Sequence, residues 1–329
     1  MNKPIHVFVL FGPTASGKTA ILKKIFKNSN EEAEVISADS MQVYRGMDIG
    51  TAKPSAEERA SLPHHLIDIR DPSEQFNAGD FVRLADEACL QIVGRGRLPV
   101  ISGGTGFYLK NFILGLSEAP PSDQEIRRQL KIDLSEKGIA SLMEELSNCD
   151  PVSAGRIHIN DEYRLLRALE VYRSCGRPLS SFEVNSNIFH GPSCGDVSGG
   201  EKMRGEYRFT IIGLSRPREE LYRRVNLRCA QMFEQGLAAE VRSLFEAGYT
   251  PDDPGMRAIG YREFFAEAEE EQGRWRFLND VEGVQVLVAQ NSRRYAKRQI
   301  TFFAKIPGVK WIECRDDDEE TAEMIRREL

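Results

Sequence analysis

Three groups of polar residues could do chemistry, and each follows a short apolar run. The first, "GPTASGKT" from Gly12 to Thr19, matches the G-x-x-x-x-G-K-[ST] pattern of a P-loop. Such a loop turns backbone N–H groups toward phosphate oxygens at the start of a helix. Its lysine reaches the phosphates and its hydroxyl residue serves a metal ion. The pattern predicts these roles for Lys18 and Thr19, and it leaves open whose phosphate is bound.

The other two groups are Asp39–Ser40 after "VIS" and Gly103–Gly104–Thr105 after "PVIS". Ligands of open α/β sheets bind beyond the carboxyl ends of the strands. We therefore expect a phosphate cradle, a carboxylate and a hydroxyl in one cleft. Three alternatives stay open at this point. Asp39 could hold magnesium or cap a helix, and Thr105 could simply cap the helix that follows it. The helix N-terminus at Gly103–Gly104 could equally be a second anion site.

The elements that must position these groups alternate over the first third of the chain. Strand-like runs are "IHVFVLFG", "AEVISADS", "HHLIDI" and "LPVISGGTG", with helices predicted from Lys18 and over "DFVRLADEACLQIVGRG". Such alternation predicts a parallel sheet wrapped by helices. From Pro120 to about Glu183 the pattern is helical without a convincing strand. A Gly- and Ser-rich stretch, 184–206, predicts a mobile loop.

Strands return with "YRFTIIGL" and "VKWIEC", and helical segments lie between them. The predicted fold class is α/β, a P-loop NTPase-like parallel sheet core wrapped by helices and interrupted by a helical insertion domain. The predicted segments are a core over 1–118, an insertion over 119–206, and the continued core with a basic C-terminal segment over 207–329. His64–His65 are interpreted as strand-edge residues rather than metal ligands.

Composition narrows the function classes. The chain has 329 residues, 41% of them hydrophobic and 29% charged, as in ordinary globular proteins. The early apolar run, Ile5 to Phe11, is too short to span a membrane and no cleavage site follows it, so we expect a cytoplasmic protein. The six cysteines are scattered without a C-x-x-C pair, which argues for reduced thiols and against a cysteine zinc site.

A net charge of −6 argues weakly against a nucleic-acid partner, but it can hide local patches. The segment "NSRRYAKRQITFFAK" holds five cations and no acidic residue, and aromatic residues lie between the charges. This segment is either a solvated helix face with a few core aromatics or a nucleic-acid contact.

Seven stretches occur in an order that carries a family resemblance: "GPTASGKT", "ISADSMQVYRGMDIGTAKP", "HHLIDIRDP", "SGGTGFYLK", "RIHINDEYRLLRALEVY", "GYREF" and "AKRQITFF". Together they closely resemble the bacterial tRNA dimethylallyltransferase family over nearly the whole chain. The resemblance implies transfer of a dimethylallyl group from its diphosphate to the exocyclic amine of the adenosine immediately 3′ of the anticodon. It implies that the P-loop holds the prenyl diphosphate rather than ATP, with Mg²⁺ as cofactor, the tRNA anticodon stem-loop as partner, no membrane, and a monomer.

The resemblance also assigns roles to residues. Asp39 is the base that faces the amine, Thr105 lies beside the reacting adenine, and Arg228 is the best match for an arginine on the diphosphate, although Arg224 is close in sequence. Lys18 completes the catalytic set, and Thr19 is the magnesium partner. The diphosphate site comprises Gly12, Pro13, Thr14, Ala15, Ser16, Gly17, Lys18 and Thr19. The tRNA contacts comprise Asp39, Ser40, Met41, Gln42, Thr105, Arg127, Tyr163, Arg164, Leu165, Leu166, Arg167, Arg257, Ala258, Ile259, Gly260, Tyr261, Arg262, Ser292, Arg293, Arg294, Tyr295, Ala296, Lys297, Arg298 and Gln299.

Two rival functions are weighed against this one. A small-molecule P-loop kinase would explain the Gly12–Thr19 loop and Asp39, but not the "DSMQVYRGMDIGTAKP" block or the basic segment. A non-catalytic RNA-binding protein on a relict nucleotide fold would not need an intact Lys18, Thr19, Asp39 and Thr105.

Overall fold

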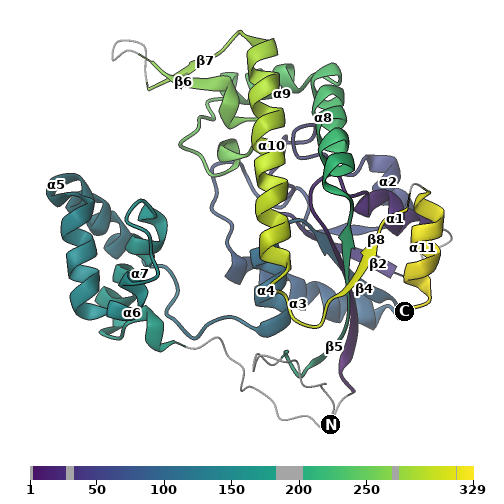
Figure 1. Cartoon of the computed structure of the whole chain (residues 1–329), viewed down its shortest axis with the longest axis horizontal. Helices are drawn as coiled ribbons and strands as arrows, with labels where there is room; N and C mark the ends of the chain where they lie inside the picture. The colour runs from purple at the N-terminus through teal and green to yellow at the C-terminus, as the bar shows by residue number, and fades with distance from the viewer. Residues whose placement is uncertain (1–2, 27–32, 183–202, 269–273, 316) are drawn as a thin grey trace. The chain divides into compact units, whose positions relative to one another are not determined.

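The computed structural model of the chain describes residues 3–26, 33–182, 203–268, 274–315 and 317–329. The chain divides into two compact units. We call Met1–Ile113 with Phe189–Leu329 the core unit, and Leu114–Ile188 the insertion unit (Figure 1). Most of the loop predicted over 184–206 lies outside the described residues. The three segments predicted from the sequence, 1–118, 119–206 and 207–329, remain a prediction.

A six-stranded sheet forms the centre of the core unit, in the order β3-β2-β4-β1-β5-β8 (Figure 1). Every neighbouring pair is parallel. The strands are β1 (Ile5–Phe11), β2 (Ala33–Ala38), β3 (His64–His65), β4 (Leu98–Gly103), β5 (Tyr207–Ser215) and β8 (Lys310–Glu313). Helices cover both faces, which explains why the central strands are nearly continuous apolar runs. The predicted α/β class and the edge position of the histidines are confirmed.

The remaining elements of the core unit are mostly helices. They are α1 (Lys18–Ile25), α2 (Ala56–Ser61), α3 (Ala78–Gly94), α4 (Gly106–Leu114), α8 (Arg218–Glu234), α9 (Leu237–Glu246), η2 (Gly255–Arg257), η3 (Arg262–Phe264), α10 (Val281–Phe303) and α11 (Asp318–Arg326), with a small hairpin of β6 (Phe265–Glu267) and β7 (Trp275–Phe277). On one face of the sheet, α1 and α11 bury Ile21 and Ile325 against Phe8 of β1. On the other face, Phe11 packs against Phe303 of α10, with ring centroids 4.7 Å apart.

The register of the sheet brings the three predicted chemical groups together. Phe11 pairs with Gly103, and Gly103 pairs with Ala38 on its other side. The phosphate loop, Asp39 and Gly104 therefore follow strand ends that lie in one row. Gly103 must be glycine, because a Cβ there would lie 2.1 Å from the carbonyl oxygen of Ala38.

The insertion unit is helical in its described residues, with α5 (Gln124–Cys149), α6 (Pro151–Ala154), α7 (Glu162–Cys175) and η1 (Leu179–Ser181). Its small core joins Leu130 and Leu146 of α5 to Leu165 and Leu169 of α7. The carboxylate of Asp123 accepts hydrogen bonds from the first backbone N–H groups of α5, as an N-cap does.

The structure departs from the predicted elements in three places. The run "HHLIDI" forms a strand only at β3, because Leu66 (φ 62°) and Asp68 (φ 57°) turn the backbone into the left-handed region. The β6–β7 hairpin and α11 were not predicted. The basic segment lies in the 23-residue helix α10 up to Phe303, and its last cation, Lys305, follows the end of that helix. Among the described residues, no helix has the length and apolar character needed to cross a membrane.

Candidate active site

The phosphate loop connects β1 to α1 and is tightly packed. Gly17, just before α1, has a φ of 99°, a conformation that side chains disfavour. A Cβ at Gly12 would lie 2.8 Å from Ser16 Oγ. Lys18 Nζ donates hydrogen bonds to the carbonyl oxygens of Gly12 at 2.8 Å and Pro13 at 3.0 Å. The ammonium group therefore lies over the loop, where a P-loop lysine meets phosphate.

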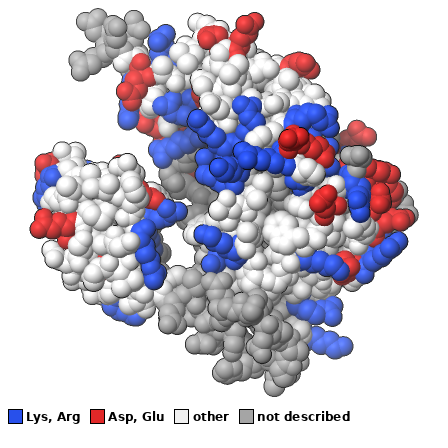
Figure 2. Space-filling model, in the orientation of Figure 1, with Lys and Arg blue, Asp and Glu red and all other residues white. Residues whose placement is uncertain are grey.

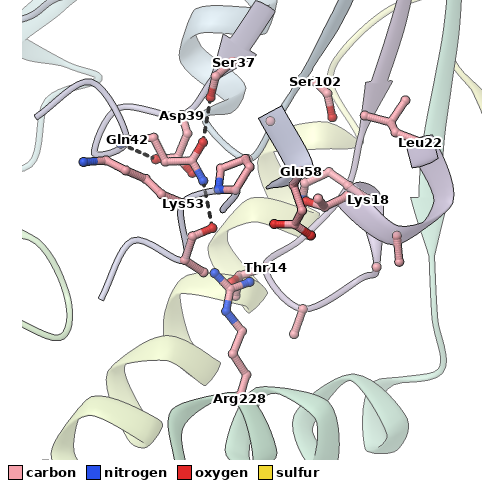
Figure 3. A pocket seen from close by; sticks show the side chains of 18 of the residues that line it. Thr14, Lys18, Leu22, Ser37, Asp39, Gln42, Lys53, Glu58, Ser102 and Arg228 are labelled. Carbon is pink, nitrogen blue, oxygen red and sulfur yellow. Dashed lines mark hydrogen bonds between the residues drawn. The ribbon is translucent and has the colours of Figure 1, made fainter. Parts of the chain in front are cut away.

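Arginines from the β5–α8 region hold this loop from outside. Arg216 Nε donates to the carbonyl of Ser16 at 3.0 Å, and Arg224 Nε donates to the carbonyl of Ala15 at 2.9 Å. Arg228 lies one turn further along α8 and points into the same cavity as Lys18 (Figure 3). Arg224 and Arg228 both line that cavity, so both candidates for the diphosphate lie beside the loop.

The charges of these groups influence one another. Burial and, to a smaller extent, the neighbouring Arg228 lower the pKa of Lys18 to about 8, against the opposing effect of Asp39. Burial also lowers the pKa of Arg228, again against the effect of Asp39. Two cations are thus held close together with one carboxylate nearby, and an anionic ligand would relieve their repulsion.

Asp39 and Thr105 lie side by side beyond β2 and β4. Asp39 Oδ1 accepts from the backbone N–H of Met41 at 2.9 Å and, more weakly, of Gln42 at 3.4 Å. Asp39 Oδ2 accepts no hydrogen bond from any described residue. Thr105 Oγ1 accepts from the backbone N–H of Ser40 at 2.9 Å and lies 3.2 Å from its hydroxyl. One carboxylate oxygen of Asp39 therefore shapes the turn, and the other is available for chemistry.

Gln299 of α10 joins the two halves of the site. Its Oε1 accepts from the backbone N–H of Thr14 at 2.8 Å, and its Nε2 donates to the carbonyl of Gly104 at 2.8 Å. The side chain is buried. A Cβ at Gly104 would lie 2.6 Å from Gln299 Nε2, which explains the second glycine of this loop. Both polar ends of this amide are therefore used inside the protein.

Two cavities meet at Asp39. A larger one of about 850 Å³ extends from the phosphate loop along α1, β2 and α8. A smaller one of about 320 Å³ is lined by the loop after β2, η2 and its flanks, and α10. Five residues line both cavities: Thr14, Asp39, Arg228, Met232 and Tyr295. Burial and, to a smaller extent, the charge of Asp39 raise the pKa of Tyr295 to about 12. The Asp39 carboxylate thus faces a phosphate cavity and a second, separate cavity.

The residues of the core unit that were predicted to contact tRNA differ in their exposure to solvent. Arg294, Lys297, Arg298 and Arg257 are exposed, whereas Ala258, Gly260, Tyr261, Ala296 and Gln299 are buried and Ile259, Arg262, Ser292, Arg293 and Tyr295 are partly buried. The hydroxyl of Tyr261 donates to Glu240 at 2.6 Å, so this side chain belongs to the interior. Lys and Arg side chains gather on the face formed by α8 and α10 (Figure 2).

In the insertion unit, Leu165 and Leu166 are buried in the small core. Tyr163 and Arg164 are exposed, and Arg127 and Arg167 are partly exposed. The predicted set therefore contains both surface cations and core residues, because it follows a continuous stretch of a helix, whose successive residues point in different directions around the helix axis.

A magnesium ion could be held at the phosphate loop with few protein ligands. Among the described residues, no group of three or more His, Cys, Asp or Glu side chains could hold a metal. Thr19 is exposed and lines the larger cavity, so its hydroxyl is available there. Mg²⁺ commonly takes one or two protein oxygens and completes its shell with phosphate oxygens and water, and this residue set fits that arrangement.

Sequence reasoning missed the residues that support the site. Glu240 of α9 accepts from the backbone N–H groups of Asp48, Ile49 and Gly50 at 2.9, 2.8 and 3.2 Å. It thereby fixes the loop that follows Asp39. No local pattern marks such a residue, because its partners lie about 190 residues away in the chain.

Comparison with known proteins now identifies the family. The family model described as IPP transferase matches residues 42–306. The chain belongs to this family. A "tRNA dimethylallyltransferase" of Geobacter sulfurreducens is 42% identical over 93% of this chain and 91% of the relative. A "tRNA dimethylallyltransferase 2" of Geotalea uraniireducens is 44% identical over 94% of this chain and 92% of the relative.

Solved structures of the family share the fold. The full-length tRNA isopentenylpyrophosphate transferase of Bacillus halodurans is 37% identical, with a TM-score of 0.65 over 99% of this chain and 95% of that one. A eukaryotic dimethylallyltransferase acting on tRNA is 25% identical, with a TM-score of 0.73 over 95% of this chain and 74% of that one. The resemblance inferred from the motifs is confirmed.

Proposed function

We propose that this protein transfers a dimethylallyl group from dimethylallyl diphosphate to the N6 amine of the adenosine immediately 3′ of the anticodon in tRNA. Diphosphate is the other product. The observation that carries the proposal is the position of Asp39 on the shared wall of two cavities. One cavity holds the phosphate loop, and the other is large enough for a flipped base.

The donor's diphosphate would lie on the phosphate loop, between Lys18 and Arg228. As the carbon–oxygen bond of the allylic carbon breaks, negative charge builds on the leaving oxygen. Preorganised cations and backbone N–H groups stabilise that charge where it develops, because the protein does not have to reorganise around it. Family membership supports this reading of the loop over ATP binding.

The acceptor amine would approach from the smaller cavity. Its lone pair is delocalised into the adenine ring, and bond formation to the allylic carbon makes the amine acidic. Asp39 Oδ2 would take the proton as the new carbon–nitrogen bond forms, which is general base catalysis. Thr105 lies beside Asp39 and would orient the amine. The base must leave its stack to reach this cavity.

Magnesium would bind the diphosphate, with Thr19 as its protein ligand. When bound, the ion supplies charge neutralisation to the leaving group. The exposed cations of α10 and the surface of the insertion unit would bind the tRNA backbone. We propose that the protein acts as a monomer and in the cytoplasm, where its tRNA substrate is found.

Purified protein incubated with unmodified tRNA, dimethylallyl diphosphate and Mg²⁺ tests the proposal. Mass spectrometry of the digested nucleosides should find one adenosine heavier by a dimethylallyl group. Lys18→Ala should reduce the rate by at least about 10²–10³, the usual effect of one lost transition-state donor. Binding of tRNA should change little. Consumption of ATP without any modified nucleoside would favour the kinase instead, and binding of tRNA without binding of the donor would favour the non-catalytic RNA-binding protein.

A further inference from the structure

The insertion unit holds a buried carboxylate to which the function has so far assigned no role. The Glu170 side chain of α7 is about 1% exposed. Its Oε1 accepts from Ser122 Oγ at 2.5 Å and from the backbone N–H of Asp123 at 2.7 Å. Its Oε2 pairs with Arg167 at 3.1 Å and Arg127 at 3.5 Å. Three hydrogen-bond donors and the ion-paired Arg167 thus converge on one carboxylate inside a single unit, where α5 and α7 lie side by side (Figure 1).

The two arginines are fixed by further contacts but keep part of their surface. Arg167 also donates to the carbonyl of Pro120. The guanidinium of Arg127 lies 4.9 Å from the ring centroid of Tyr163. About a quarter of each arginine side chain is exposed. Each arginine is therefore held by protein groups and still has exposed surface that an anion could reach.

The cluster around Glu170 differs in net charge from the cluster around Arg173 in the same unit. There, Arg173 pairs with both Asp133 and Glu145, and Lys137 pairs with Asp133, so positive and negative groups balance. At Glu170, two arginines share one carboxylate. The excess positive charge lies at the surface next to an exposed tyrosine ring, a combination that suits phosphate and unpaired bases.

We infer that Glu170 is a positioning residue that orders Arg127 and Arg167 for contact with tRNA; this inference rests on the proposed function. A free arginine loses much rotamer freedom when it binds a phosphate, and one that is already ordered loses less. That difference is worth roughly 2- to 10-fold in affinity for each side chain. The tyrosine beside Arg127 would present its ring to a base of the anticodon loop.

The variant Glu170→Gln separates positioning from a simple effect of charge, because the two predict opposite changes in the Kd for tRNA. An amide keeps the volume but offers an acceptor on only one side and carries no charge, so the three hydrogen bonds and the ion pair with Arg167 cannot all be kept. Removing a negative charge would by itself tighten tRNA binding. Loss of positioning should instead raise the Kd for tRNA by roughly tenfold. The KM for dimethylallyl diphosphate and the kcat at saturating tRNA should stay unchanged.

Asp133→Asn is the matched control, because it disturbs a carboxylate–arginine cluster in the same unit without touching these arginines. It should leave the Kd for tRNA as in the wild type at equal thermal stability. A double-mutant cycle of Glu170→Gln with Arg127→Gln should be non-additive, since Glu170 acts through that arginine. Additive effects, or an unchanged or tighter Kd in Glu170→Gln, would overturn the inference.

Arg127→Lys provides a second test if Glu170→Gln does not fold. Lysine keeps the charge but loses the planar guanidinium that Glu170 and Tyr163 hold, so the Kd for tRNA should rise. Wild-type affinity in this variant would mean that charge alone suffices and that positioning is wrong. A wild-type protein that binds no tRNA would refute the proposed function itself. An active wild type with a normal Glu170→Gln would refute only the positioning.

Discussion

The lowered pKa of Lys18 makes a quantitative prediction about donor binding. With a pKa of about 8, the ammonium is mostly charged at pH 7 and mostly neutral at pH 9. Diphosphate binds only the charged form well, so protonation and donor binding support each other. The charged fraction falls about tenfold between pH 7 and pH 9, and kcat/KM for the donor should fall about tenfold with it. The kcat should change little, because bound diphosphate holds the proton on Lys18.

Steady-state assays at saturating tRNA and fixed ionic strength would measure this profile in half-unit steps. Lys18→Arg is the control, since a guanidinium stays charged over the whole range. This variant is expected to be slower but to show no inflection near pH 8. A flat profile in the wild type, or the same inflection in Lys18→Arg, would refute the assignment of this titration to Lys18.

Three further substitutions test other parts of the site. Asp39→Asn keeps the Oδ1 contact to the turn but cannot take a proton, so single-turnover rates should fall by about 10²–10⁴ with donor affinity intact; a rate near wild type would return Asp39 to a structural or metal-holding role. Gln299→Met leaves the buried carbonyl of Gly104 and the partly buried N–H of Thr14 without their partner and should lower the free energy of unfolding by about 1–3 kcal/mol, as urea titration would show; the exposed Lys297→Met should cost almost nothing. Replacing Lys297 and Arg298 by Gln should weaken tRNA binding and flatten its salt dependence by about one to two units, since each cation would neutralise one phosphate. An unchanged slope would mean that these residues form an ordinary solvated surface.

The sequence predicted the parts of the site that local patterns encode. The glycines of the phosphate loop are required by its backbone geometry, and the lysine belongs to the same short motif. An apolar run followed by polar residues marks a strand end. Parallel pairing then places the ends at Phe11, Ala38 and Gly103 in one row. The convergence of the three groups follows from topology alone.

Long-range contacts could not be predicted in the same way. Residues 258 and 261 lie in a stretch that the resemblance assigned to tRNA, yet they are buried. A motif marks the whole stretch and does not separate its interior positions from its exposed ones. Glu240 and Gln299 bind backbone groups about 190 or more residues away. Neither residue differs by type or spacing from an ordinary helical glutamate or glutamine.

The two faces of α10 give the site a physical link between its substrates. Its outer face carries exposed cations such as Lys297 and Arg298. Its inner face carries Gln299, whose amide bonds both the phosphate loop at Thr14 and the strand end at Gly104. Because a helix moves as a rigid body, a shift of α10 upon tRNA binding would be felt at both loops at once. A buried amide with two satisfied ends tolerates little displacement, so Gln299 favours a single arrangement of the phosphate loop at Thr14 and the strand end at Gly104.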